Sequence, residues 1–231
     1  FFQAQAHPHA GLLRLPGAPY LLQPPCWALR GPAPALGEAD AEAAEDPARL
    51  FGGRNGHRTR APRGKGRGAR AAAPSAAAGE APPGAGSDAS PARPLAGVRV
   101  LDLSWVWAGP YATQMLAFLG AEVIKIESAR RPDLARRLNL YPTGMEPGLN
   151  RNGYFNQIGL GKHSAAINLA HPEGLALVKA IAAQSDVVGS NFATGVLERL
   201  GLTAEAFHAV KPELIVASIS GYGKTGPLAH Y

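Results

Sequence analysis

Short apolar runs alternate with helical patterns from Pro94 to the end of the chain. Runs of the β type, rich in Val, Ile and Leu, lie at residues 98–104, 121–127, 164–170, 186–192 and 213–221. Apolar residues at helical spacing follow at residues 113–120, 171–186, 195–201 and 204–211. Strands that alternate with helices in this way predict an α/β fold, a mostly parallel, doubly wound Rossmann-like sheet with helices on both faces.

Local signals support several of these helices. Gly120 follows the first helical pattern, and Pro172 stands near the first position of the second. Thr203 is a good N-cap for the last helix, and Pro212 marks its end. Between the second and third runs, residues 128–152 show no clear period, and we expect a loop there.

The chain before Pro94 has two segments of different amino-acid composition. In residues 7–50, prolines and glycines interrupt short apolar runs, which predicts a loop-rich tail with one short helix from about Gly37 to Leu50. This tail is too small for a core of its own and should pack on something larger. Residues 49–93 are rich in Ala, Gly, Pro and Arg and almost free of large apolar side chains, so we expect a disordered linker.

The net charge of +6 depends on that linker. Residues 49–93 contain nine basic and two acidic residues, whereas residues 94–231 contain twelve basic and ten acidic ones. The basic half of the linker, residues 49–70, favours a nucleic-acid hypothesis only weakly, because a solvated linker has the same composition. We therefore do not expect nucleic acid as a partner.

Three further features limit the class of protein. Cys26 is the only cysteine, so a disulfide framework is excluded and a reducing compartment is expected. No apolar run approaches the ~20 residues of a membrane-spanning helix. These features predict a cytoplasmic protein without a membrane partner. The chain begins with Phe1 and ends at Tyr231 directly after a loop signal, which we expect of a piece of a longer protein.

Ligands of doubly wound sheets bind at the carboxyl ends of the strands, where this chain has five polar or small loops. The first loop, SWVWAGP at residues 104–110, has one glycine where a dinucleotide site requires three. Trp105 and Trp107 would block a dinucleotide there, but they suit an apolar or adenine pocket and equally a position in the core. Glu127 ends the second strand at the place of a ribose-binding acid, but a salt-bridged or solvated role is favoured.

Other site types find no support in the sequence. The loop GYGKTGP at residues 221–227 lacks the spacing of a phosphate-binding ATPase loop. The seven histidines form no metal-ligand pattern, so no metal is expected. Ser104 and Ser220 have no recognisable base partner, and the hydrolase elbow G-x-S-x-G is absent.

Four motifs in the same order resemble the start of the family III CoA-transferases (CaiB/BaiF), the group of the formyl-CoA and carnitine CoA-transferases. They are PLAGVRVLDLSWVWAGPYATQMLAFLGAEVIKIE, PEGLALV, DVVGSNFATGVLERLGL and PELIVASISGYGKTGP. The segments HPHAG, PGAPY and PAPALGE of residues 7–47 resemble the other end of the same family. The resemblance therefore implies the tail of one transferase in residues 1–48, a linker in 49–93 and the N-terminal part of a second transferase in 94–231.

The resemblance implies the transfer of CoA from an acyl-CoA donor to a carboxylic acid through an aspartyl-CoA intermediate. The family's nucleophilic Asp would lie beyond this chain, so no catalytic residue is expected within it. The implied cofactor is coenzyme A, bound as the acyl-CoA substrate. Its expected contacts are Val106, Trp107, Ala108, Ile167, Asn191, Phe192, Ala193 and Arg199.

Two positions depart from the family pattern. Ser128 stands where many members have Arg, and Ala170 stands where many have Lys, so two cations near the CoA phosphates are lost; Arg130 or Arg131 is the expected substitute. These departures keep open a non-catalytic CoA-binding or scaffold role. An acyl-CoA racemase of the same superfamily is a further alternative, because it shares these motifs. The family's interlocked dimer implies either a homodimer or an intramolecular pseudo-dimer of a tandem chain.

Overall fold

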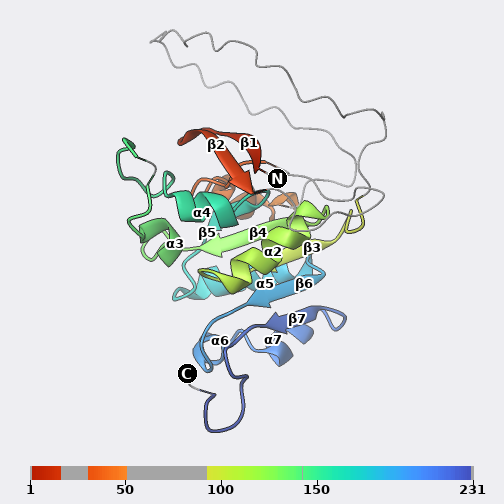
Figure 1. The fold of residues 1–231 in the computed structure, drawn as a ribbon. Coiled ribbons are helices and arrows are strands. Elements are labelled where there is room, and N and C mark those ends of the chain that lie inside the picture. Colours follow the sequence, from red (N-terminus) through yellow and green to blue (C-terminus); the bar gives the residue numbers. More distant parts are fainter. Residues whose placement is uncertain (1, 17–30, 51–92, 142, 230–231) are drawn as a thin grey trace.

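The computed structural model describes residues 2–16, 31–50, 93–141 and 143–229 (Figure 1). The linker that was predicted to be disordered therefore lies almost wholly outside the described residues. The same is true of its basic residues 49–70, and Cys26 also lies outside them. Within these residues, no helix has both the length and the apolar composition needed to cross a membrane. The described part also contains no group of three or more His, Cys, Asp or Glu side chains that could hold a metal ion.

A five-stranded sheet forms the centre of the structure. Its strands are β3 (Arg99–Asp102), β4 (Glu122–Glu127), β5 (His163–Ala166), β6 (Val187–Ser190) and β7 (Ile215–Ser218). They run in the order β5-β4-β3-β6-β7, and every neighbouring pair is parallel. This confirms the predicted Rossmann-like α/β fold.

Helices cover both faces of this sheet (Figure 1). On one face, α2 (Ala108–Phe118) lies over β3 and β4, with α4 (Gly153–Ile158) beside it. The other face holds α5 (Pro172–Ala183) and α7 (Ala204–His208), which pack against each other. Two one-turn helices, α3 (Leu134–Arg137) and α6 (Val196–Arg199), follow the ends of β4 and β6.

Alternate residues of each strand supply the two layers, since successive side chains point to opposite faces. Leu101 and Ile124 belong to the large core cluster on the α5 face. Val100 and Val123 pack with Ala117 of α2 on the opposite face. The central strands β3 and β4 are thus buried on both sides, as near-continuous apolar strand sequences predict, whereas the edge strand β7 is largely exposed.

The tail packs on the edge of the same sheet. The single short helix predicted from about Gly37 to Leu50 is two elements in the structure, helix α1 (Asp40–Glu45) and the 3₁₀ helix η1 (Pro47–Leu50). The N–H of Ala39 donates to the Ser164 carbonyl (2.9 Å), and Asp40 Oδ1 accepts from the N–H of Ala166 (2.6 Å). These bonds occupy the free edge of β5, which would otherwise expose unpaired backbone groups.

Three elements differ from the sequence-based expectation. The first residues form an antiparallel hairpin of β1 (Phe2–His7) and β2 (Gly11–Pro16), where a loop-rich tail was expected. The expected loop of residues 128–152 contains α3, and α4 begins directly after it. Asn152 starts α4 by accepting from the N–H groups of Tyr154 (2.9 Å) and Phe155 (3.2 Å), a cap that a hydrophobic pattern does not reveal.

Candidate functional site

The candidate site lies at the carboxyl edge of the sheet, between β3 and β6. From β3 the chain leaves toward α2 on one face, and from β6 it leaves toward α6 and α7 on the other. Neighbouring parallel strands whose connections diverge in this way leave a crevice where ligands of open α/β sheets bind. The loops after β3 and β6, residues 103–107 and 191–195, border it.

Asn191 joins these two loops. Its Oδ1 accepts from the N–H of Trp105 (2.7 Å), and its Nδ2 donates to the carbonyls of Trp105 (2.6 Å) and Val106 (3.2 Å). The side-chain amide is therefore engaged with backbone, and Asn191 positions the loop rather than offering a free amide. Its predicted direct contact with CoA stays a prediction.

The loop that Asn191 holds has an unusual backbone. Val106 and Trp107 have φ angles of 47° and 48°, which non-glycine residues rarely adopt and which are especially unfavourable for β-branched Val. The Asp133 carboxylate accepts from the N–H of Val106 (3.1 Å), and the Tyr154 hydroxyl accepts from the N–H of Trp107 (3.1 Å). Side chains from distant segments thus hold a strained turn, a situation that is common at functional sites.

The single glycine of this loop has a steric reason. A Cβ at position 109 would collide with Ser104 and would lie 2.9 Å from Asn191 Cγ. Gly109 therefore allows the start of α2 to pack directly against the loop and its anchor. The glycine serves close packing here, not the approach of a pyrophosphate.

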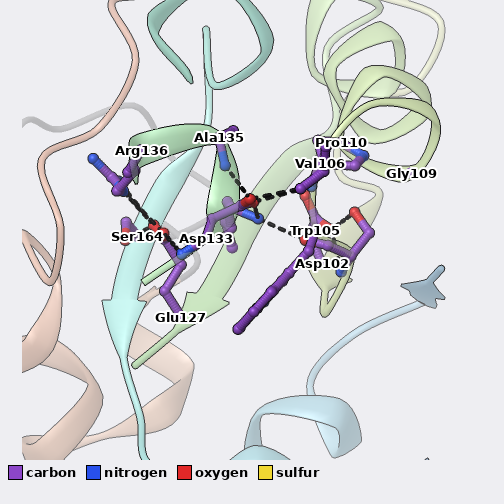
Figure 2. Close-up of polar contacts among 12 residues, drawn as sticks. Asp102, Trp105, Val106, Gly109, Pro110, Glu127, Asp133, Ala135, Arg136 and Ser164 are labelled. Carbon is purple, nitrogen blue, oxygen red and sulfur yellow. Dashed lines mark hydrogen bonds and ion pairs between the residues drawn. The ribbon is translucent and has the colours of Figure 1, made fainter. Parts of the chain in front are cut away.

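Three buried ion pairs lie beneath the strained turn on the α2 face, and Figure 2 shows the carboxylate ends of this network. Lys125 Nζ lies 2.8 Å from Asp133 Oδ2 and donates to the Ser104 carbonyl (2.6 Å). Burial lowers the pKa of Lys125, but Asp133 and the other nearby carboxylates outweigh it, so the net shift is upward. Lys125 is therefore charged, and it fixes the same carboxylate that holds Val106.

The second pair joins β3 to the residue before β5. Lys162 Nζ lies 3.0 Å from Asp102 Oδ2 and also donates to the Pro110 carbonyl (2.7 Å). Burial would raise the pKa of Asp102, but Lys162, Lys125 and hydrogen bonds from Ser104 and Thr113 lower it to about 2. Burial lowers the pKa of Lys162 to about 8 against the effect of Asp102, so both groups are charged near neutral pH.

The third pair settles the role of Glu127. Arg136 donates to both Glu127 oxygens, with its Nη2 lying 2.8 Å from Oε2, and Ser164 Oγ donates to the same oxygen (3.2 Å). Arg136 Nη2 also donates to the Pro34 carbonyl of the tail (3.0 Å). Glu127 is salt-bridged and buried, which confirms the interpretation favoured over a ribose-binding role.

A pocket of about 370 Å³ opens on the opposite, α5 face of the same edge. In that size range, small-molecule sites are common. Its walls are mainly apolar, and Trp105 meets Phe192 edge to face with ring centroids 5.7 Å apart. The lining residues are Leu103, Trp105, Ile126, Glu127, Ser128, Arg130, Arg131, Ile167, Asn168, Leu169, Ala170, Phe192, Val196 and Leu200.

The predicted contacts divide between the pocket and its surroundings. Ile167 and Phe192 line the pocket, whereas Trp107 is 75% exposed and stands edge-on to Tyr154. The other five predicted contacts belong to the bordering loops, the start of α2 and the end of α6, and they do not line the pocket: Val106, Ala108, Asn191, Ala193 and Arg199. Trp105 is thus a pocket residue, and Trp107 is neither a core nor a pocket residue.

The sequence-based reasoning missed the ion-pair network. One signal was present, because Lys125 interrupts an apolar strand run and a lone charge inside such a run requires a buried partner. The partner, Asp133, is separated from it by a turn whose geometry the pattern does not give. Both departures from the family pattern, Ser128 and Ala170, line the pocket.

Comparison with known families and proteins gives consistent results. Residues 95–231 match the model of CoA-transferase family III. Similar proteins include the succinyl-CoA:glutarate CoA-transferase of Mus musculus, 41% identical over 145 residues, covering 62% of this chain and 32% of that protein. The acetyl-CoA:oxalate CoA-transferase of Acetobacter aceti is 38% identical over 143 residues, covering 62% and 35%.

The chain is also similar to a solved structure. A CaiB/BaiF family protein from Brucella suis superposes with a TM-score of 0.54 at 37% identity, covering 60% of this chain and 36% of that one. The chain spans about a third of the length of the curated relatives cited above.

Proposed function

The chain belongs to CoA-transferase family III, and from this premise we propose that the full-length protein transfers CoA from an acyl-CoA donor to a carboxylic acid. Residues 94–231 would form part of the CoA site, as the N-terminal part of a transferase domain. The pocket beside the strained loop carries this proposal. It combines a largely apolar wall, two aromatic rings and a cationic mouth at the carboxyl edge of the sheet.

These features suit the nucleotide end of CoA. An adenine ring can stack on Trp105 or Phe192 and contact Ile167, as aromatic side chains commonly accept bases. The loop of Val106, Trp107 and Ala108 would contact the rest of the CoA molecule along the crevice. Asn191 would act on CoA through this loop, because its amide fixes the loop's backbone.

The proposed chemistry uses a carboxylate nucleophile. An aspartate attacks the donor's thioester carbonyl, the C–S bond breaks, and a mixed anhydride and CoA thiolate result. The thiolate then attacks the aspartyl carbonyl, releasing the donor acid and forming aspartyl-CoA. The acceptor carboxylate attacks this thioester, the C–S bond breaks, and a second mixed anhydride and CoA thiolate form. The thiolate then attacks the acceptor's carbonyl of this anhydride, which gives the acceptor's CoA thioester and regenerates the aspartate.

The two most buried aspartates of residues 94–229 are committed to other roles. Asp102 accepts hydrogen bonds from Ser104 and Thr113 and pairs with Lys162, and Asp133 pairs with Lys125. Neither side chain is exposed to solvent. The third aspartate, Asp186, lies at the amino end of β6 and pairs with Lys211, away from the carboxyl edge of the sheet. We therefore propose that the nucleophile is an aspartate outside residues 1–231.

The relatives suggest which acids to test. The mouse and Acetobacter proteins are named for succinyl-CoA with glutarate and for acetyl-CoA with oxalate. We propose that this protein also uses a short acyl-CoA donor and a small dicarboxylate acceptor. Within the proposed tandem arrangement, residues 1–48 end one transferase unit, and the two units form an interlocked pair.

A transfer assay tests the function. The full-length protein is incubated with succinyl-CoA or acetyl-CoA and with glutarate or oxalate, and new CoA thioesters are identified by mass spectrometry. The expected result is an acceptor thioester that appears only when donor, acceptor and protein are all present. If no donor–acceptor pair reacts and calorimetry detects no CoA binding, the proposal is wrong.

A further inference from the structure

The charged residues at the pocket mouth are unbalanced. Of the three charged side chains that line the pocket, Glu127 is neutralised by Arg136, and the other two are Arg130 and Arg131. The remaining polar lining residues, Ser128 and Asn168, are uncharged. The mouth of an otherwise apolar pocket thus has two positive charges.

Neither arginine is neutralised by a carboxylate within the described part of the chain. Both are exposed, and neither guanidinium forms an ion pair or hydrogen bond with another described residue. The Arg131 guanidinium carbon lies 5.7 Å from the Trp105 ring centroid. This places one cation against the aromatic wall at a distance typical of a cation–π contact.

The backbone that presents the two arginines is anchored on both sides. The N–H of Arg131 donates to the Ser128 carbonyl (3.1 Å), which closes a turn directly after β4. The next two residues, Pro132 and Asp133, are buried, and Asp133 pairs with Lys125 and caps α3. The ion-pair network on the α2 face therefore fixes the position of the basic turn on the pocket side.

We propose that Arg130 and Arg131 bind a phosphate group of the CoA nucleotide at the mouth of this pocket. The inference rests on the proposed function and deepens it. It assigns to this turn the cationic phosphate contact that the uncharged residues Ser128 and Ala170 cannot supply. Guanidinium groups bind phosphate through paired N–H donors, and the neighbouring aromatic and apolar wall fits the adenine ring. CoA carries a phosphate on the ribose and a pyrophosphate, and both present this chemistry.

Calorimetric titration of the full-length protein tests the assignment. The variant Arg130→Gln/Arg131→Gln should bind CoA at least about tenfold more weakly than the original protein, because charge-assisted hydrogen bonds are lost. Its Kd should also depend less on NaCl concentration, since fewer ionic contacts are screened. The matched control Arg137→Gln removes an exposed arginine of α3 that does not line the pocket, and it should bind CoA like the original protein.

Dephospho-CoA, which retains the pyrophosphate, identifies the phosphate group. If the double variant loses affinity for CoA but not for dephospho-CoA, the two arginines bind the ribose phosphate. If it loses affinity equally for both ligands and its salt dependence is reduced, they bind the pyrophosphate. An unchanged CoA affinity in the double variant overturns the proposal, as does a loss that leaves the salt dependence unaltered. If the original protein binds neither ligand, the proposed function fails instead.

Discussion

The two faces of the sheet's carboxyl edge are built from alternate residues of the same strands but differ in chemistry. On the α5 face, Leu103 and Ile126 line the apolar pocket. On the α2 face, Asp102 and Lys125 are neighbours in register and belong to a network of buried ion pairs. One pair of strands thus supplies a ligand-sized space on one side and a polar anchor on the other.

The difference shows how a strained loop is kept in place. A buried ion pair gives little net stability, because the desolvation of both charges offsets much of their attraction. Its partners can, however, fix geometry, and here Asp133 holds the N–H of Val106 while Lys125 holds the Ser104 carbonyl. We infer that the α2 face positions the loop and that the α5 face contacts the ligand.

The largest effect is expected from breaking the anchor. Lys125→Met leaves Asp133 buried without its cation and the Ser104 carbonyl without its donor. The free energy of unfolding should fall by about 3–5 kcal/mol, the usual cost of removing one partner of a buried pair. Urea denaturation monitored by circular dichroism measures it.

The same substitution at the surface is the control. Lys224 faces Glu198 at 3.6 Å, and both side chains are nearly half exposed. Lys224→Met should therefore cost no more than about 1 kcal/mol. Equal costs for the two variants would contradict the anchoring role of the α2 face.

A smaller effect is expected from acid. The pKa of Asp102 is lowered to about 2 in the folded protein from an ordinary value of 3.8, so its contribution is fully present above pH 4 and is lost as the pH falls toward 2. By proton linkage this amounts to about 2 kcal/mol of the free energy of unfolding. Urea denaturation at a series of pH values measures the loss.

The double variant Asp102→Asn/Lys162→Met isolates that contribution, because it removes both charges of the pair. Its stability should decline less between pH 4 and pH 2 than that of the original protein. An identical decline would show that Asp102 has no part in the acid sensitivity.

On the pocket side, the expected effect is on affinity. Phe192→Ala removes one of the two aromatic walls, and the Kd for CoA should rise about tenfold, within the range measured when an aromatic ring that stacks on a base is removed. Tyr222→Ala removes an aromatic side chain that is 63% exposed and does not line the pocket, and it should leave the Kd unchanged. Calorimetry with CoA measures both values. Equal affinities for the two variants would exclude a ligand role for the Phe192 side of the pocket.

These two faces also differ in how far the sequence predicted them. The apolar runs VRVLDLS and AEVIKIE predict two of the strands, and the location of a site at their carboxyl ends follows from the parallel arrangement of the sheet. Phe192 was predicted as a CoA contact from its position and from the resemblance, Ile167 from the resemblance alone, and both line the pocket. The anchor was not predicted, because the pairing of Lys162 with Asp102 joins positions 60 residues apart. Such pairing depends on the register of β3, β4 and β5, which hydrophobic periodicity leaves undetermined.

The smallest effect is expected where the anchor meets solvent. Tyr154→Phe removes only the hydroxyl that accepts from the N–H of Trp107 (3.1 Å), and Trp107 is largely exposed. Water can replace this acceptor, so the free energy of unfolding should change by less than about 1 kcal/mol. The turn should nevertheless become more mobile, and amide exchange measured by NMR should be faster at Trp107 than at Val106, whose N–H remains bonded to Asp133. Equal acceleration at both residues would mean that the turn moves as one unit and that Asp133 alone does not hold Val106.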